Sequence, residues 1–152
     1  AGAVLALLVE NQGRVDYGQA IHDRKGVTGP VLLDGVEVEG WTSRPLPLDD
    51  LSGLDFAPTT APLVGPAFHR GVVHVDAPAD TFLSLAGWTK GNAWVNGFHL
   101  GRYWSRGPQQ TLYVPAPVLR AGGNEITVLE LHATRRPVVA LVDRPDLGPT
   151  DR

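Results

Sequence analysis

Short apolar runs separated by turn-forming residues make up most of this chain of 152 residues. Glycine occurs 18 times and proline 13 times, and no long stretch repeats its apolar positions with the 3.6-residue period of a helix. Short strands divided by such turns are typical of an all-β sandwich or barrel. We expect strands at residues 4–10, 31–33, 36–41, 68–75, 81–85, 93–95, 98–102, 111–114, 125–132 and 138–142, and one brief helical turn at 117–120.

The clearest pair of strands flanks Asn96-Gly97, a dipeptide that tolerates positive φ at both central positions of a two-residue hairpin turn. Such a turn pairs the flanking residues outward from the turn: Val95 with Phe98, Trp94 with His99, and Ala93 with Leu100. Because successive side chains of a strand point to opposite faces, one face is wholly apolar and is expected to meet the core. That face holds Ala93, Val95, Phe98 and Leu100. Asp34-Gly35 predicts a second tight turn.

The opposite face of this hairpin carries aromatic and polar side chains. Trp94 is expected beside His99, and a flat ring with a polar neighbour suits the apolar face and the hydroxyls of a sugar ring. Arg102 and Trp104 end the hairpin, where they either pack as a cation–π pair or form the rim of a ligand site. Trp94, His99, Arg102 and Trp104 are therefore the candidate carbohydrate-binding residues. The alternative is structural, with a loop or a neighbouring domain covering the rings.

A stretch with three prolines and no periodicity, residues 49–66, predicts a long loop or linker. It divides the chain into a lead segment, residues 1–48, and a main sandwich segment, residues 67–148. The lead segment is expected to hold either the terminal strands of a preceding β-domain or the first strands of the sandwich. Its apolar run, residues 1–9, lacks the basic flank and cleavage pattern of a signal peptide, so a buried strand is expected there.

Composition excludes several kinds of partner. The net charge is −3 and basic residues form no block, so nucleic acid is not expected as a partner. No apolar run reaches the length of about 18 residues that a membrane span needs. Cysteine is absent and no histidines have the spacing of a zinc site, so neither a histidine-bound metal nor a cofactor is expected, while a calcium site of loop carbonyls and aspartates stays open. The excess of arginine over lysine is typical of a GC-rich bacterium, and the compartment, cytoplasmic or secreted, stays open.

Several long motifs resemble the non-catalytic region of one enzyme family. Residues 87–115 read GWTKGNAWVNGFHLGRYWSRGPQQTLYVP, residues 10–18 read ENQGRVDYG, and residues 124–131 read NEITVLEL. Shorter matches follow at residues 23–27, DRKGV, and 142–145, VDRP. These motifs are similar to segments near the C-terminus of glycoside hydrolase family 35, the β-galactosidases. The resemblance covers residues 1–48 and 65–148.

This resemblance implies a jelly-roll β-sandwich, galactose-binding-domain-like, from the non-catalytic C-terminal part of a β-galactosidase. It also implies that the chain is a piece of a longer protein. The catalytic barrel domain of the same polypeptide, with the two glutamates that hydrolyse terminal β-galactosides, would lie outside it. The chain would support that barrel and shape the rim of its pocket, and Asn11, Arg14 and Tyr17 would face the other domain or the rim. The alternatives are an independent galactoside-binding or other carbohydrate-binding module, and a protein-interaction module.

The carboxylates of the chain suggest no catalytic centre. Retaining glycoside hydrolysis needs two carboxyl groups about 5 Å apart, and the group that acts as acid has a raised pKa. Glu10 and Glu130 are the carboxylates set in strongly apolar strands, and each is expected near a strand end, paired with an arginine. A Gly-x-Ser-x-Gly elbow and a phosphate-binding glycine loop are both absent from the sequence. No catalytic residue is therefore assigned.

Overall fold

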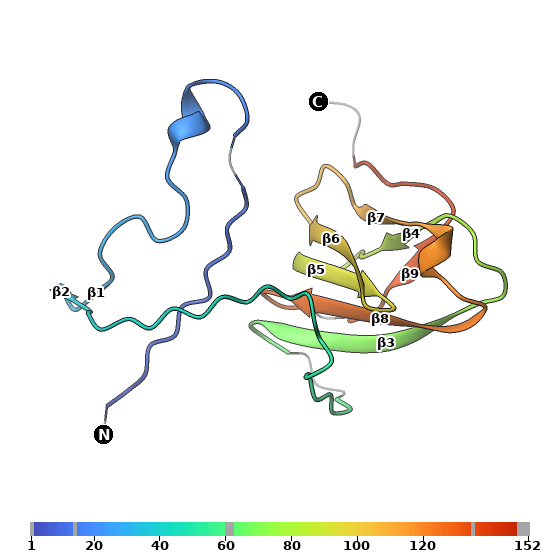
Figure 1. The fold of residues 1–152 in the computed structure, drawn as a ribbon, viewed down its shortest axis with the longest axis horizontal. Helices are drawn as coiled ribbons and strands as arrows, with labels where there is room; N and C mark the ends of the chain where they lie inside the picture. The colour runs from blue at the N-terminus through green and yellow to red at the C-terminus, as the bar shows by residue number, and fades with distance from the viewer. Residues whose placement is uncertain (1, 14, 60–62, 135, 149–152) are drawn as a thin grey trace. The chain divides into compact units, whose positions relative to one another are not determined.

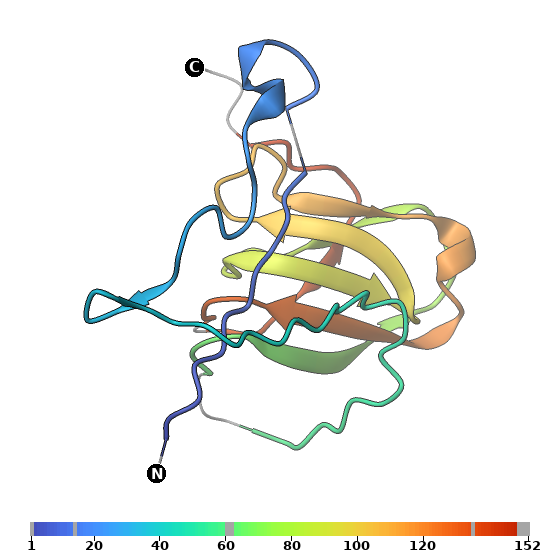
Figure 2. The ribbon, with the colours of Figure 1, turned by 60° about the vertical axis from the view of Figure 1, so that its left-hand side comes forward.

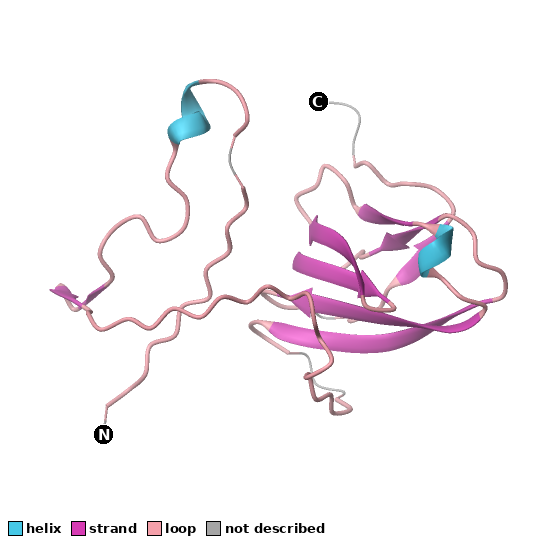
Figure 3. Cartoon of the chain, viewed as in Figure 1, coloured by secondary structure: helices cyan, strands magenta, loops and turns pink. Residues whose placement is uncertain are grey.

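The computed structural model describes residues 2–13, 15–59, 63–134 and 136–148. The chain divides into two compact units, a first unit, Ala1–Leu46, and a second unit, Pro47–Arg152. Strands and loops make up nearly all of the described residues, and the helical elements are two short 3₁₀ turns (Figures 1 and 3). The prediction of an all-β chain is confirmed.

The second unit is a sandwich of two antiparallel sheets (Figure 1). The four-stranded sheet has the order β3-β8-β5-β6, with bounds Ala67–Val75, Gly122–Glu130, Lys90–Val95 and Phe98–Trp104. The three-stranded sheet has the order β7-β4-β9, with bounds Thr111–Val114, Thr81–Ser84 and Ala140–Val142. The 3₁₀ turn η2, Ala116–Val118, overlaps the turn predicted at 117–120. This arrangement confirms the jelly-roll sandwich.

The core lies between the two sheets and is made of alternate residues of their strands. Leu83 and Leu112 face it from the three-stranded sheet, and Val95 and Ile126 face it from the four-stranded sheet. Trp88 closes one end of the core, and its indole Nε1 donates to the carbonyl oxygen of Val138 at 2.8 Å. Full burial of an aliphatic side chain contributes about 1.5–3 kcal/mol, so this cluster provides the main driving force for folding of the second unit.

The hairpin turn predicted at Asn96-Gly97 is confirmed, with φ of 49° and 80° at its two residues. Val95 pairs with Phe98 and Trp94 pairs with His99, as predicted. The third predicted pair is wrong: a β-bulge makes Ala93 face Gly101, whose φ of 123° an L-amino acid rarely adopts. Leu100 packs against the core as expected, but Phe98 is 51% exposed. It follows the turn at the end of the edge strand β6, beyond the reach of the core cluster.

The first unit contains little regular structure: the 3₁₀ turn η1, Gln19–His22, and the strands β1, Leu32–Leu33, and β2, Val36–Glu37. The tight turn predicted at Asp34-Gly35 is confirmed by φ of 51° and 82°. The buried strand predicted at residues 4–10 is wrong, because the segment pairs with no strand and Val4 is 94% exposed. A strand needs a neighbour for its backbone groups and a surface against which to bury its side chains. The described residues of this unit supply neither.

Candidate functional site

The outer face of the four-stranded sheet carries the side chains predicted to bind carbohydrate. Trp94 and His99 stack with ring centroids 4.8 Å apart and an angle of 28° between the ring planes. Phe68 of β3 contacts Trp94 with a centroid distance of 6.2 Å. Trp94 is only 2% exposed, so its ring is closed to a ligand approaching from solvent. The burial of Trp94 therefore agrees with the structural alternative given above, in which neighbouring parts of the protein cover the ring.

His99 itself lies near the surface of the same face. Its Nε2 forms a hydrogen bond with Oδ1 of Asn92 at 3.1 Å. Partial burial beside the indole lowers the pKa of His99. The imidazole is therefore mostly neutral near pH 7, and it can exchange a hydrogen bond with a ligand on its exposed side.

Trp104 is held by two cations at the far end of the hairpin. Nζ of Lys90 lies 4.9 Å from the centroid of the Trp104 ring, and Cζ of Arg106 lies 5.6 Å from it. A cation–π contact was expected here with Arg102 as the cation, whereas the cations found over the Trp104 ring are Lys90 and Arg106. Arg102 is exposed on the same outer face, opposite Asn92. The structure thus joins Trp94 to His99 and places Trp104 in a separate cluster, and sugar binding by the four residues stays a prediction.

The polar residues predicted at a domain boundary or pocket rim lie in the first unit. Oδ1 of Asn11 accepts a hydrogen bond from the backbone N–H of Gly13 at 2.9 Å, so Asn11 stabilises a tight corner. Tyr17 is 89% exposed, and Arg14 lies outside the described residues. A rim role for these residues stays a prediction.

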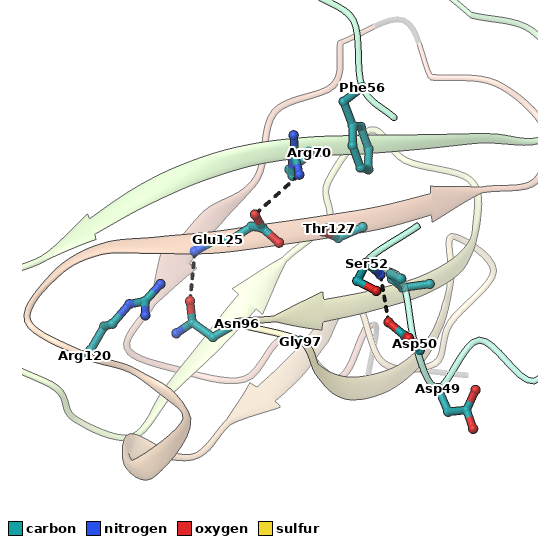
Figure 4. Close-up of a pocket in the computed structure, with 11 residues that line it drawn as sticks. Asp49, Asp50, Ser52, Phe56, Arg70, Asn96, Gly97, Arg120, Glu125 and Thr127 are labelled. Carbon is teal, nitrogen blue, oxygen red and sulfur yellow. Dashed lines mark hydrogen bonds and ion pairs between the residues drawn. The ribbon is translucent and has the colours of Figure 1, made fainter. Parts of the chain in front are cut away.

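A pocket of about 490 Å³ opens on the outer face of the four-stranded sheet (Figure 4). The loop 49–56, which passes over this face, forms one wall (Figure 2). Arg70 of β3 with Glu125 and Thr127 of β8 form the floor, and the Asn96-Gly97 turn and Arg120 complete the lining. Sequence reasoning missed this pocket. The signal in the sequence was a charged residue within each of two strands, Arg70 in β3 and Glu125 in β8, and the antiparallel register is needed to bring those charges together.

The charged groups of the pocket are only partly paired. Nη1 of Arg70 lies 3.8 Å from Oε2 of Glu125, and both side chains are nearly half exposed, at 44% and 46%. The Arg70 guanidinium also stacks on Phe56, with its Cζ 4.1 Å from the ring centroid. Nε of Arg120 donates to the carbonyl oxygen of Gly123 at 3.1 Å.

Both ends of the pocket are fixed by hydrogen bonds. Oδ1 of Asn96 accepts from the backbone N–H of Glu125 at 3.0 Å. Its Nδ2 donates to Val118 O and to Oδ1 of Asn124, each at 2.8 Å. On the loop, Oδ1 of Asp50 accepts from the N–H of Ser52 at 2.8 Å. Hydrogen bonds from the Ser52 backbone and side chain lower the pKa of Asp50, so this carboxylate is charged at neutral pH.

Inside the sandwich, the buried carboxylate of Glu130 accepts hydrogen bonds from several neighbouring groups. Its carboxylate accepts from the N–H of Thr89 at 2.8 Å, the N–H of His132 at 2.9 Å and the hydroxyl of Tyr103 at 3.2 Å. The Thr89 hydroxyl and the N–H of Lys90 donate to it as well. An arginine partner was expected for Glu130, but among the described residues backbone amides and hydroxyls satisfy its charge instead.

The pKa values of this cluster follow from its burial and hydrogen bonds. Burial raises the pKa of Glu130, but the hydrogen bonds from Thr89, His132 and Lys90 outweigh it and leave the pKa below its ordinary value. Burial and the neighbouring Glu130 charge raise the pKa of Tyr103. An acid of glycoside hydrolysis needs the opposite shift in the pKa of its carboxyl group.

Within the part of the chain that the structure describes, no three histidine, aspartate or glutamate side chains are grouped to hold a metal ion. None of the described helices is long and apolar enough to span a membrane.

Comparison with known proteins decides the family. Residues 66–124 match the family model "Beta-galactosidase, galactose-binding domain", and residues 1–47 match "Beta-galactosidase, first all-beta domain". The chain belongs to the β-domains of the β-galactosidases. It is 42% identical to the beta-galactosidase of Macaca fascicularis and 41% identical to that of Homo sapiens, in each case over 97% of this chain. It is 45% identical to the beta-galactosidase of Xanthomonas manihotis over 72% of this chain.

The chain spans 26% of the length of the first two of these β-galactosidases and 18% of the third. Within it, the sandwich extends past the matched galactose-binding domain, because Ile126 and Val128 of β8 belong to the same core as Leu83. Trp94, His99, Arg102 and Trp104 all lie in the galactose-binding-domain match. Asn11, Arg14 and Tyr17 lie in the match to the first all-β domain.

Proposed function

We propose that this chain is the non-catalytic C-terminal scaffold of a complete β-galactosidase of glycoside hydrolase family 35. The complete enzyme hydrolyses terminal β-galactosides, and its catalytic barrel is the surface on which this chain packs. The high arginine content supports a bacterial source for it. The observation that carries the proposal is the state of the first unit, which is rich in apolar side chains and has no buried residue among those described.

The exposed side chains of the first unit indicate that it is completed by another part of the protein. About half of the residue surface is exposed at each of Leu5, Leu7, Leu8 and Val9. The exposed fraction is larger at Leu33 and Val36 of the β1–β2 hairpin. Burying one such side chain contributes about 1.5–3 kcal/mol, which is a large fraction of the stability of a domain. Because the relatives are about four times as long as this chain, the remainder of the same polypeptide is the natural source of the covering surface.

The polar corner near Asn11 then has a simple role. Asn11 holds the backbone turn, and Tyr17 extends into solvent with 89% of its surface exposed. On docking, Tyr17 is free to reach the rim of the galactose pocket, with Arg14 close to it in sequence. A tyrosine at such a rim offers an apolar ring face and one hydroxyl to a sugar.

The test replaces an apolar side chain that is exposed here but covered in the complete enzyme. Leu8→Asp is expected to leave the melting temperature of the isolated chain unchanged, because Leu8 is 52% exposed in it. In the full-length enzyme it is expected to cost a few kcal/mol of stability, since it buries an unpaired charge. Thermal melting and hydrolysis of nitrophenyl β-galactoside measure this effect.

Gln12→Asp is the matched control, because it adds the same charge at an exposed polar position of the same unit. It should change neither measurement. Equal, small effects of Leu8→Asp and Gln12→Asp on the full-length enzyme would contradict the scaffold proposal.

A further inference from the structure

The pocket on the outer face of the second unit has no assigned role. We infer that it is a binding site for a neutral sugar ring, at a place distinct from the hairpin residues Trp94 and Trp104. The site is formed entirely by residues of the second unit, so it does not depend on the scaffold role proposed above.

The charge of the lining favours a neutral ligand. Asp49, Asp50 and Glu125 are set against Arg70 and Arg120, so acidic and basic groups nearly balance. A ligand with a full charge of either sign would face groups of its own sign at short range. A sugar hydroxyl donates one hydrogen bond and accepts others, so it can bind a carboxylate and a guanidinium at the same time.

The ion pair on the floor has the geometry that such a hydroxyl needs. The Arg70 and Glu125 groups are 3.8 Å apart, longer than a direct hydrogen bond, and both side chains are nearly half exposed. Each side chain can therefore still form a hydrogen bond with a ligand in the pocket. Figure 4 shows Glu125 between Arg70 and Asn96. Adjacent hydroxyls of one sugar ring can accept from Arg70 and donate to Glu125.

An aromatic ring and a fixed frame complete the site. Phe56 stands over the pocket with one face against Arg70 and supplies apolar surface for the C–H groups of a sugar (Figure 4). The hydrogen bonds of Asn96 hold the turn side, and Thr127, which is buried, holds the floor. Because these groups are ordered before a ligand arrives, binding would cost little conformational entropy.

The size of the pocket agrees with this class of ligand. Its volume of about 490 Å³ lies in the range of about 300–1,000 Å³ that is usual for small-molecule sites. It is open on one side, which suits the terminal residue of a longer glycan as well as a free sugar.

The experiment is an NMR titration of the 152-residue chain with methyl β-galactoside, methyl β-glucoside and lactose. We expect saturable shifts in the backbone amides of Ser52, Gly97 and Glu125 and in the Nε–H signal of Arg120. Glu125→Gln keeps the shape of the floor but removes the charged acceptor, and we expect it to weaken binding about tenfold or more. Asp76→Asn makes the same carboxylate-to-amide change at an exposed residue of the second unit outside the pocket, so it is the matched control and should bind as the unchanged chain does.

Three outcomes would overturn the inference. In the first, all three sugars leave the pocket signals unmoved up to tens of millimolar. In the second, the shifts cluster at His99, Arg102 and Trp104, which would place the sugar on the hairpin. In the third, Glu125→Gln and Asp76→Asn bind equally well. The amide spectrum of each variant without sugar establishes whether it is folded, and none of these outcomes bears on the scaffold proposal.

Discussion

Glu130 offers the sharpest test of how the second unit is held together. The residue is 1% exposed. Its carboxylate accepts hydrogen bonds from the backbone N–H of Thr89, just before β5, and from that of His132, just after β8. Glu130→Gln keeps the shape of the side chain but turns one acceptor oxygen into an NH₂ group. Whichever way the amide is oriented, that NH₂ meets at least one backbone N–H, of Thr89 or of His132.

The expected magnitude follows from those contacts. A buried donor left without an acceptor costs about 1–3 kcal/mol, and the surviving hydrogen bonds to a neutral amide are weaker than those to a charged carboxylate. Glu130→Gln is therefore expected to lower the free energy of unfolding by about 2–5 kcal/mol. Urea unfolding at pH 7, followed by tryptophan fluorescence, measures this difference. Glu125→Gln, on the same strand but with a loose and half-exposed ion pair, should change it by less than about 1 kcal/mol.

The effect of Glu130 also has a predicted pH dependence. Its pKa in the folded chain lies below the ordinary value of 4.5, so its ionised form is stabilised by folding. That contribution is present above the unfolded-state pKa and is lost as the pH falls through the folded-state pKa. The difference in stability between the unchanged chain and Glu130→Gln should therefore shrink when the pH is lowered below 4.5. Equal stability of the two proteins at pH 7, or a gap that stays constant in acid, would refute this reasoning.

Three further substitutions test the packing of the four-stranded sheet, each by urea unfolding. Gly91→Ala should lower the free energy of unfolding by about 3 kcal/mol or more, because a Cβ at this position would lie 1.7 Å from the carbonyl oxygen of Leu129. Gly71→Ala on β3 is the control, since a Cβ there meets nothing within 4 Å and the stability should hardly change. Trp94→Ala should lower the free energy of unfolding by about 3–5 kcal/mol, because it leaves a cavity at a buried site. Trp104 is half-buried and serves as the comparison. A loss for Trp94→Ala as small as that for Trp104→Ala would contradict the covered position of Trp94. Asn96→Ala should lower the free energy of unfolding by about 2 kcal/mol or more, because it removes three hydrogen bonds and a residue suited to positive φ. A stability equal to that of the unchanged chain would show that water replaces the three hydrogen bonds.

Local patterns predicted the parts of the fold that depend on neighbours in sequence. The turn at Asn96-Gly97 and the two pairs beside it were predictable, because a two-residue turn determines its own register. The bulge at Gly101 was not, since an extra residue in one strand shows only against its partner. The burial of Trp94 likewise depends on Phe68, a residue of another strand.

The same limit applies to the candidate sites. The donors around Glu130 come from neighbouring strands that are far apart in sequence. An acidic residue in an apolar run therefore suggested an arginine partner, whereas among the described residues amides and hydroxyls hold the charge. The pocket brings Arg70 together with Glu125 through the pairing of β3 with β8. In the first unit, the apolar run at residues 4–10 predicted burial, but the surface that would bury it is not among the described residues.

The order of strands in the larger sheet sets the sequence of events during synthesis. The hairpin of β5 and β6 closes over a two-residue turn and can form as soon as it leaves the ribosome. The strand β3 is made earlier, yet among the described strands it has one neighbour in the sheet, β8, which is made after β4, β5, β6 and β7. Its unpaired edge must therefore wait through the synthesis of almost the whole sandwich. During that wait β3 is the segment most exposed to pairing with another nascent chain, and the arrival of β8 is the step that ends the risk.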